Sequence, residues 1–132
     1  MAPLKTHRAV FPLDEISERV IGCAFTVANT LGTGFLEKVY ENALAHRLTK
    51  AGVMVRQRIA IGVEYDGVTA GAYVADPLVE NAALVEIKAV RALDTNHDNQ
   101  CLNYLRATCL TVYLLMNLAS PRLEIRPRVN GF

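Results

Sequence analysis

The stretch "LVEIKAV", residues 84–90, places an acid and a lysine two positions apart in an otherwise apolar run. If this run is a β-strand, Leu84, Glu86 and Lys88 point to one face, because side chains alternate along a strand. Burying charged groups costs free energy unless they pair or bind something. Two interpretations follow: an ion pair that is purely structural, or an acid and a lysine that act on a bound ligand.

A further acid, Asp76, stands in the equally apolar run "AYVADPLVE", and Pro77 after it is expected to interrupt regular strand pairing. A third acid, Glu37, lies near the start of a predicted helix. Three different elements can therefore each place one carboxylate, from Glu37, Asp76 or Glu86, in the same site. A hydrated Mg²⁺ takes one or two carboxylates, keeps several waters and binds substrate phosphate, and a neighbouring lysine can orient a nucleophilic water. The constellation favours metal-dependent phosphoryl chemistry, and an ion pair of Asp76 with Lys88 is the structural alternative.

The stretch "LGTGFLEKVYENAL", residues 31–44, places two glycines directly before a predicted helix. A phosphate-binding loop is excluded, because a Rossmann fingerprint needs a preceding strand and a Walker loop needs a lysine followed by serine or threonine. Gly32 and Gly34 are therefore expected to turn the chain between two helices. Glu37 then lies at the border of the apolar stripe, where it can face the charged pocket; the alternative is a solvated acid favoured by the helix dipole.

The helices that must position these residues are predicted from apolar spacing. A first helix is expected from a cap at Asp14 to Leu31, and a second follows the glycines and ends before Gly52. A third is expected over about 95–107. The predicted core face of the second helix consists of Leu36, Val39, Tyr40, Ala43, Leu44 and Leu48.

The strands are predicted from β-branched runs and turn dipeptides. An antiparallel meander of three strands is expected in "VMVRQRIAIGVEY", "VTAGAYVADPLVE" and "ALVEIKAV", with turns at Asp66-Gly67 and around Asn81. A buried strand in "TVYLLMNL" follows the third helix, and the last run, "RLEIRPRV", is expected at a sheet edge because Pro127 interrupts it. The order predicts a mixed α/β fold with helices covering a central sheet.

Composition limits the class of protein. The 132 residues are expected to form one domain, with 1–12 as an irregular N-terminal arm, and 52% hydrophobic and 20% charged residues are typical of a globular protein. A net charge of +1 gives no overall attraction to nucleic acid, so binding it requires a local basic patch. Such apolar content also favours a homo-oligomer, a dimer or larger.

Cysteine usage and hydropathy indicate the compartment. Cys23, Cys101 and Cys109 are odd in number and spaced unlike a CxxC pair, which predicts reduced thiols rather than a zinc site or a disulfide framework. The N-terminus lacks the apolar region of a signal peptide, and no apolar run reaches ~18 residues. We therefore expect a cytoplasmic protein that does not enter a membrane.

The run Gly34-Phe35-Leu36-Glu37-Lys38-Val39-Tyr40, extended by "ENAL", resembles the namesake motif of the GxxExxY family of small prokaryotic proteins. Further similar pieces, from about residue 14 to residue 130, are "YVADPLVE", "LVEIKAV", "HDNQCLNYLRAT" and "LLMN". That family in turn resembles the PD-(D/E)XK nuclease superfamily. The resemblance implies a restriction-endonuclease-like core: a central mixed sheet of four or five strands flanked by three helices.

The resemblance also implies roles for individual residues. Asp76 matches the metal-binding aspartate, Glu86 and Lys88 match the E-x-K pair, Glu37 matches an acid on the preceding helix, and Gln100 matches a polar residue on the following helix. The implied cofactor is Mg²⁺ or Mn²⁺, held by Asp76, Glu86 and the Ile87 carbonyl, with Glu37 as a candidate further ligand. Tyr104, four residues after Gln100, shares its helix face.

The implied activity is metal-dependent hydrolysis of phosphodiester bonds in nucleic acid. The alternative is a non-catalytic nuclease-like module that binds nucleic acid or assembles oligomers. Three positions depart from the family: Val74 and Pro77 stand where arginine and leucine are usual, and Tyr113 stands where a small residue is usual.

Overall fold

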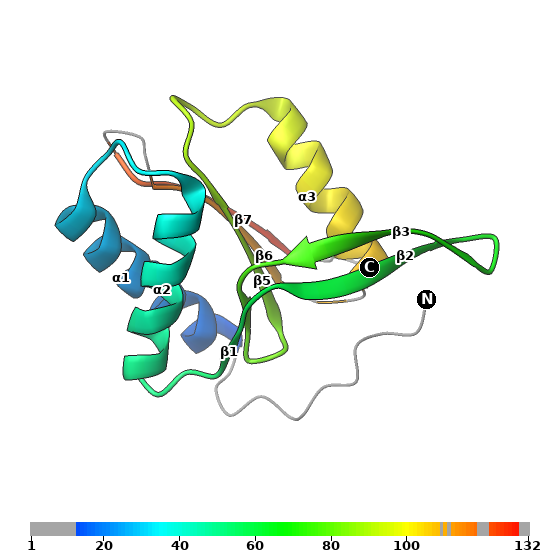
Figure 1. Ribbon diagram of the computed structural model, residues 1–132, viewed down its shortest axis with the longest axis horizontal. Helices are drawn as coiled ribbons and strands as arrows, with labels where there is room; N and C mark the ends of the chain where they lie inside the picture. The colour runs from blue at the N-terminus through cyan, green and yellow to red at the C-terminus, as the bar shows by residue number, and fades with distance from the viewer. Residues whose placement is uncertain (1–12, 109, 111, 119–121, 130–132) are drawn as a thin grey trace.

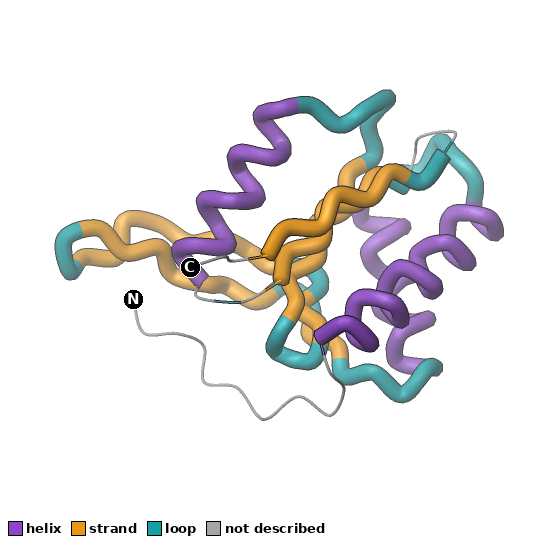
Figure 2. Tube along the Cα trace, turned by 180° about the vertical axis from the view of Figure 1, so that it is seen from behind, coloured by secondary structure: helices purple, strands orange, loops and turns teal. Residues whose placement is uncertain are grey.

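Three helices surround a central five-stranded sheet, and a two-stranded hairpin projects from it (Figures 1 and 2). The computed structural model describes residues 13–108, 110, 112–118 and 122–129, so the expected N-terminal arm at 1–12 lies outside the described residues. In chain order the elements are α1 (Leu13–Leu31), α2 (Glu37–Lys50), β1 (Val55–Arg56), β2 (Ile59–Tyr65), β3 (Val68–Ala75), β4 (Leu78–Val79), β5 (Ala83–Lys88), α3 (Thr95–Thr108), β6 (Val112–Asn117) and β7 (Glu124–Val129).

The central sheet has the strand order β1-β4-β5-β6-β7, and β2 pairs only with β3. β5 and β6 are parallel, while the other neighbours in both sheets are antiparallel. The predicted mixed α/β fold with a restriction-endonuclease-like core is confirmed. β6 is buried along its whole length, and β7, which contains Pro127, is an edge strand as expected.

The predicted meander of three continuous strands is wrong in one respect, because its first two strands are each broken. The first divides into β1 and β2 around Arg58, whose φ of 56° is incompatible with extended backbone. The second divides into β3 and β4 at Pro77, which has no backbone N–H to donate to a neighbouring strand. The two broken strands therefore contribute to both sheets: β1 and β4 belong to the central sheet, and β2 and β3 form the hairpin. Asp76 lies at the junction between the two sheets.

Both predicted turns have the geometry that tight hairpins require. Asp66 and Gly67 have φ values of 53° and 76°, and Glu80 and Asn81 have 54° and 50°. Positive φ at both central residues matches the right-handed twist of the flanking strands. Glu80 is also nearly inaccessible, at 2% exposure, and its Oε2 accepts a hydrogen bond of 2.6 Å from the Met54 backbone N–H.

Two apolar cores lie on opposite faces of the central sheet. Val85 and Ile87 of β5 pack with α1 and α2, whereas Leu84 packs on the other face with α3 and the hairpin. The predicted alternation along β5 is therefore confirmed. One face of the sheet is covered by a pair of helices and the other by α3 and the base of the hairpin (Figure 1).

The predicted core face of α2 is wrong at two positions. Leu36 is 79% exposed and Val39 is 39% exposed. Leu36 is the N-cap, with the extended dihedrals φ −72° and ψ 156°, so it does not continue the helical stripe. Tyr40, Leu44 and Leu48, at i, i+4 and i+8, form the buried face.

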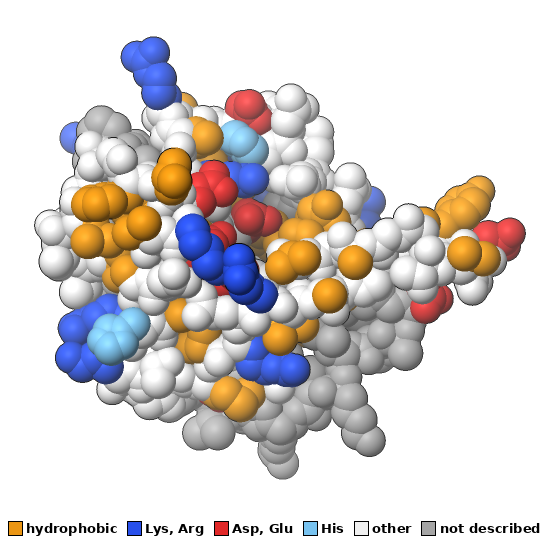
Figure 3. Space-filling view, in the orientation of Figure 1, with side chains coloured by type: hydrophobic (Ala, Val, Ile, Leu, Met, Phe, Trp, Pro, Cys, Tyr) orange, Lys and Arg blue, Asp and Glu red, His pale blue; other side chains and the backbone are white. Residues whose placement is uncertain are grey.

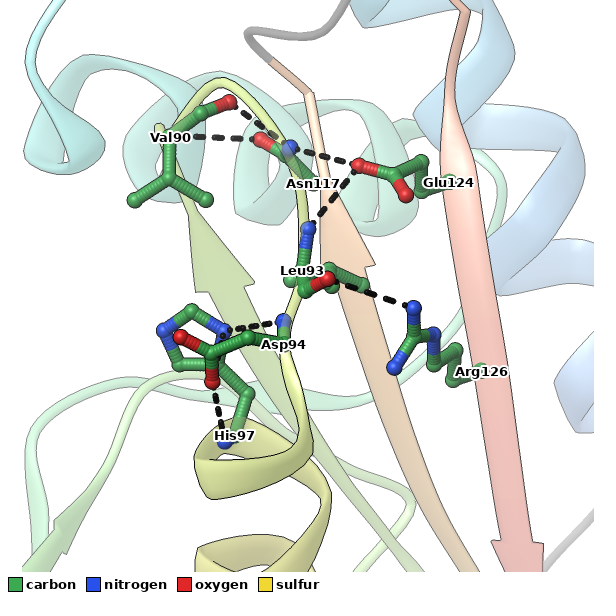
Figure 4. Close-up of polar contacts among 7 residues, drawn as sticks. All are labelled: Val90, Leu93, Asp94, His97, Asn117, Glu124 and Arg126. Atoms are coloured by element: carbon green, nitrogen blue, oxygen red, sulfur yellow. Dashed lines mark hydrogen bonds and ion pairs between the residues drawn. The ribbon is translucent and has the colours of Figure 1, made fainter.

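The connection between β5 and α3 is held by a buried polar network (Figure 4). Asn117, which is completely inaccessible, donates to the Val90 carbonyl (2.8 Å) and accepts from the Val90 N–H (3.2 Å). The Asn117 Nδ2 and the Leu93 N–H both donate to Glu124 Oε1, at 2.9 and 3.2 Å. At the start of α3, the Asp94 Oδ1 accepts from the His97 N–H (3.1 Å). These contacts determine where the chain goes after Lys88.

One cysteine and the helices bear on the predictions about thiols and membranes. Cys23 is a free thiol on α1, and burial raises its pKa. Cys109 and the Cys101 side chain lie outside the described residues. No helix in the described part of the chain is both long and apolar enough to cross a bilayer.

Candidate functional site

Asp76 and Glu86 are direct neighbours across two chain segments. Asp76 follows β3 and forms an isolated parallel bridge with Glu86 on β5. Immediately afterwards the chain reverses, since β4 pairs with β5 in the antiparallel sense. The break at Pro77 thus brings the backbone of an acidic residue from the hairpin beside that of an acidic residue of the central sheet. Only 9% of Asp76 is exposed.

The Asp76 carboxylate accepts a hydrogen bond at each oxygen. Lys38 Nζ lies 2.7 Å from Oδ2 and forms an ion pair with it, and Gln57 Nε2 lies 3.2 Å from Oδ1. The same Gln57 nitrogen donates to Asn42 Oδ1 (3.0 Å), and Lys38 Nζ also lies 3.6 Å from Glu41 Oε1. Donors from α2 and from the break between β1 and β2 therefore hold Asp76.

The Glu86 carboxylate is held by two tyrosines instead of a cation. The hydroxyls of Tyr73 and Tyr113 both donate to Oε1, at 2.8 and 3.1 Å. The Tyr73 ring stacks on Tyr104 of α3, with ring centres 3.9 Å apart. Burial, and then the negative charge of Glu86, raise the pKa of Tyr73 far above its ordinary value, so its hydroxyl remains a donor.

Glu37 faces the sheet rather than solvent. Its Oε2 accepts a hydrogen bond of 3.3 Å from the backbone N–H of Ala89, just after β5. Glu37, Lys38 and Ala89 line a cavity of about 480 Å³ together with Phe35, Leu36 and Glu41. Acidic side chains gather near the middle of this face of the molecule, directly beside Lys or Arg side chains (Figure 3).

Comparison with known proteins identifies the family of this chain. Residues 14–128 match the family model described as the PD-(D/E)XK nuclease superfamily. The chain belongs to the PD-(D/E)XK nuclease superfamily. No match is found among the curated proteins.

Two solved structures are similar to this PD-(D/E)XK protein, and only the first of them, which shares the fold, bears on the fold. The crystal structure of SSO0001 superimposes with a TM-score of 0.51 at 18% identity, covering 90% of this chain and 60% of that one. An alkaline exonuclease (LHK-Exo) from Laribacter hongkongensis has a TM-score of 0.43 at 12% identity, covering 91% of this chain and 83% of that one. The chain thus spans about 60% of the length of SSO0001.

Two residues of the predicted site, Lys88 and Gln100, make no side-chain hydrogen bond or ion pair to the carboxylates within the described part of the chain. Lys88 is half-buried, and its ammonium forms no hydrogen bond or ion pair with the described residues. Gln100 is exposed on α3, and within the described part of the chain its side chain has no hydrogen bond. One helical turn later, Tyr104 does reach the site through its stack on Tyr73.

The Ile87 carbonyl is oriented toward the side of β5 where Asp76 lies. The Lys88 carbonyl accepts a hydrogen bond from the Leu118 N–H, on the β6 side (3.2 Å), and the Val85 N–H donates to the Pro77 carbonyl, on the opposite side (3.1 Å). Successive residues of a strand direct their backbone groups to opposite sides. The carbonyl of Ile87 therefore points to the same side as the N–H of Val85, which is the side away from β6.

Glu41 is a member of the acidic group that the sequence predictions missed. Burial, followed by the charge of Asp76, raises its pKa; Lys38 opposes this, and Glu37 and Glu86 add smaller increases. Glu41 therefore lies in the field of all three predicted acids. Its spacing of four residues from Glu37 on α2 was the available signal, since i and i+4 share a helix face.

The donor set fits a hard divalent cation in its chemistry. Asp76, Glu86 and the Ile87 carbonyl offer oxygen ligands, which Mg²⁺ and Mn²⁺ prefer. Among the described residues, no group of three or more His, Cys, Asp or Glu side chains is arranged as a metal cage. Mg²⁺ does not require one, because it usually keeps several waters and uses one or two carboxylates.

Proposed function

We propose that this PD-(D/E)XK protein is a divalent-metal-dependent nuclease that hydrolyses phosphodiester bonds of nucleic acid in the cytoplasm. The observation that carries the proposal is the direct juxtaposition of Asp76 and Glu86, with Lys88 two residues further along the same strand. Residues 1–132 would act as one domain.

In this proposal each residue has a distinct role. Asp76, Glu86 and the Ile87 carbonyl hold Mg²⁺ or Mn²⁺, and Glu37 contributes a further carboxylate. A bound metal would polarise a phosphoryl oxygen and lower the pKa of a coordinated water. Lys88, whose ammonium has no other partner in the described chain, orients the attacking water and stabilises negative charge on the phosphate. Gln100 completes the polar surroundings from α3.

We further infer that the chain belongs to the GxxExxY branch. Each residue of that motif has a defined structural task. Gly34 has a φ of 103°, which favours glycine, and Tyr40 is fully buried and donates to the Gly32 carbonyl (2.6 Å). Tyr40 thereby anchors the loop before α2, which directs Glu37 toward β5.

The test is thermal unfolding of the wild type and of the Asp76→Ala, Glu86→Ala double variant, with and without Mn²⁺ or Mg²⁺ at matched ionic strength. A ligand that binds only the folded state stabilises it by mass action, by about 2.7 kcal/mol at a hundredfold excess over Kd. We expect stabilisation of the wild type alone. Absence of any metal effect on either protein would overturn the proposed metal site.

The role of Lys88 has its own test in cleavage of labelled single- and double-stranded DNA and RNA. Lys88→Ala should abolish cleavage, whereas Lys50→Ala, an exposed lysine at the end of α2, should cleave at the parental rate. Cleavage by Lys88→Ala at the parental rate would refute the assignment of Lys88.

A non-catalytic module for nucleic-acid binding or oligomeric assembly is the second candidate function. It is favoured by the contacts that satisfy both carboxylates from within the chain: Lys38 and Gln57 at Asp76, and the two tyrosines at Glu86. A purely structural network would show no metal-dependent stabilisation. The thermal unfolding test therefore separates the two functions.

We also propose that the protein forms a homo-oligomer. The tip of the β2–β3 hairpin supports this, because Tyr65 and Val68 are 77% and 65% exposed there. Apolar side chains at the end of a projecting ribbon are unusual unless a partner covers them.

A further inference from the structure

Two tyrosine hydroxyls converge on a single oxygen of Glu86. Tyr73 OH lies 2.8 Å and Tyr113 OH 3.1 Å from Oε1, and the hydroxyls are 3.4 Å from each other. The other oxygen, Oε2, accepts no hydrogen bond from the described residues. The carboxylate is therefore satisfied on one side only.

The two tyrosines are themselves held rigidly by three separate elements. Tyr73 projects from β3 and is 7% exposed, while Tyr113 projects from β6 and is 1% exposed. Tyr73 is further restrained by its stack on Tyr104 of α3. Neither phenol can turn away from Glu86 without disturbing the packing of the second core, to which both belong.

The two tyrosine hydroxyls hold the Glu86 carboxylate without neutralising its charge. A lysine or arginine beside Oε1, in the position that Lys38 has at Asp76, would neutralise the carboxylate and weaken its attraction for a metal. A neutral hydroxyl donates a hydrogen bond and leaves the negative charge in place. Hydrogen bonds to ligand residues are known to orient them and to tune metal affinity.

We propose that Tyr73 and Tyr113 are positioning residues that hold Oε1 of Glu86, so that Oε2 is the single oxygen presented to the divalent cation. This inference rests on the proposed function, because it assumes a metal at Glu86. The two tyrosines, on β3 and β6, are additional site residues outside α2, which carries Glu37, and β5, which carries Glu86 and Lys88. Tyr104 supports them by packing.

The test uses phenylalanine variants, which remove only a hydroxyl, and measures Mn²⁺ affinity by calorimetry. Tyr73→Phe and Tyr113→Phe should each raise the Kd for Mn²⁺, and the double variant should raise it roughly 10-fold or more. Tyr65→Phe is the matched control, since Tyr65 is exposed near the hairpin tip and should leave the Kd unchanged. Denaturant unfolding of every variant would show that the fold persists under the conditions of measurement.

Each outcome decides between two ideas. If Glu86→Gln loses Mn²⁺ but the Tyr73→Phe, Tyr113→Phe double variant binds it with the wild-type Kd, the positioning role is wrong and the proposed function stands. If the wild type itself binds no Mn²⁺, both are overturned. A second readout does not require metal: the carbon-13 resonance of the Glu86 carboxyl should move in both phenylalanine variants and stay in place in Tyr65→Phe.

Discussion

At the scale of single residues, the cation nearest to Asp76 belongs to the chain itself. Lys38 Nζ forms an ion pair with Asp76 Oδ2 at 2.7 Å, and the Lys38 side chain is 39% exposed. A metal ion at Asp76 must therefore displace the ammonium or share the carboxylate with it. The exposure of Lys38 allows the side chain to move into solvent at modest cost.

Replacing Lys38 by methionine should strengthen metal binding. The variant keeps the length of the side chain but removes the competing charge. Lys38 is 39% exposed and Asp76 9%, and the value for an ion pair at the protein surface, about 0.5–1 kcal/mol, corresponds to roughly a 2- to 5-fold lower Kd for Mn²⁺. Calorimetry would measure it, with Lys50→Met as the control. An unchanged or higher Kd in Lys38→Met would mean that Lys38 does not compete with the metal.

Glu41 should make the stability of the fold depend on pH. Its raised pKa means that the folded state prefers the protonated acid, so its contribution to stability is fully present below the unfolded pKa of about 4.3 and is lost as the pH rises through the higher folded pKa. Glu41→Gln should therefore be more stable than the wild type at pH 7, with a gap that shrinks toward pH 4.

The measurement for Glu41 is denaturant unfolding in the presence of a chelator at several pH values. Glu18→Gln, an exposed acid on α1, should show no such trend. A gap between Glu41→Gln and the wild type that is equal at pH 4 and pH 7 would contradict the assigned cause.

At the scale of elements, the connection from β5 to α3 depends on one buried amide. Asn117 supplies both a donor and an acceptor to Val90 and a donor to Glu124. Asn117→Ala should lower the free energy of unfolding by about 2–3 kcal/mol, because it leaves buried polar groups unsatisfied. Urea unfolding would measure this, with Asn99→Ala, exposed on α3, expected within about 0.5 kcal/mol of the wild type. A similar small effect for Asn117→Ala would show that the network is dispensable.

The elements also show what local sequence can predict. The helices and both turns follow from apolar spacing and turn residues, and the break at Pro77 follows from a missing N–H. The break at Arg58 carries no such signal, because arginine has no special preference for positive φ. Leu36 was misjudged since its spacing matches the helical stripe while its backbone is extended.

The candidate site divides in the same way. Asp76, Glu86 and Lys88 stand out because charge is unusual in apolar strands, and Glu37 stands out at the start of its helix. The residues that contact these acids do not stand out in the sequence. Tyr113 is 27 residues away from Glu86, and Lys38 is 38 residues away from Asp76. Such contacts depend on strand order and register, which propensity and spacing do not encode.

At the scale of the whole molecule, the hairpin projects from the sheet and exposes two neighbouring apolar side chains at its tip. Replacing Tyr65 and Val68, which face each other across the strands, by threonine should reduce self-association and change stability by less than about 0.5 kcal/mol. Sedimentation velocity would measure the change in mass. Phe25→Thr, at a 47% exposed position on α1, is the comparison; loss of association there but not in the hairpin variant would locate the contact on α1.

The tyrosine cluster gives this protein an optical property. The sequence has no tryptophan and five tyrosines, so its ultraviolet emission comes from tyrosine alone. Tyr73, Tyr104 and Tyr113 are three of the five, and two of them donate to the Glu86 carboxylate. We expect a phenol that donates to a carboxylate to be quenched, because the excited phenol is a stronger acid. A cation that draws electron density from Glu86 would weaken that quenching. If a metal binds at Glu86 as proposed, the tyrosine fluorescence of the unlabelled chain should therefore increase, and that increase would report how much of the protein has bound metal.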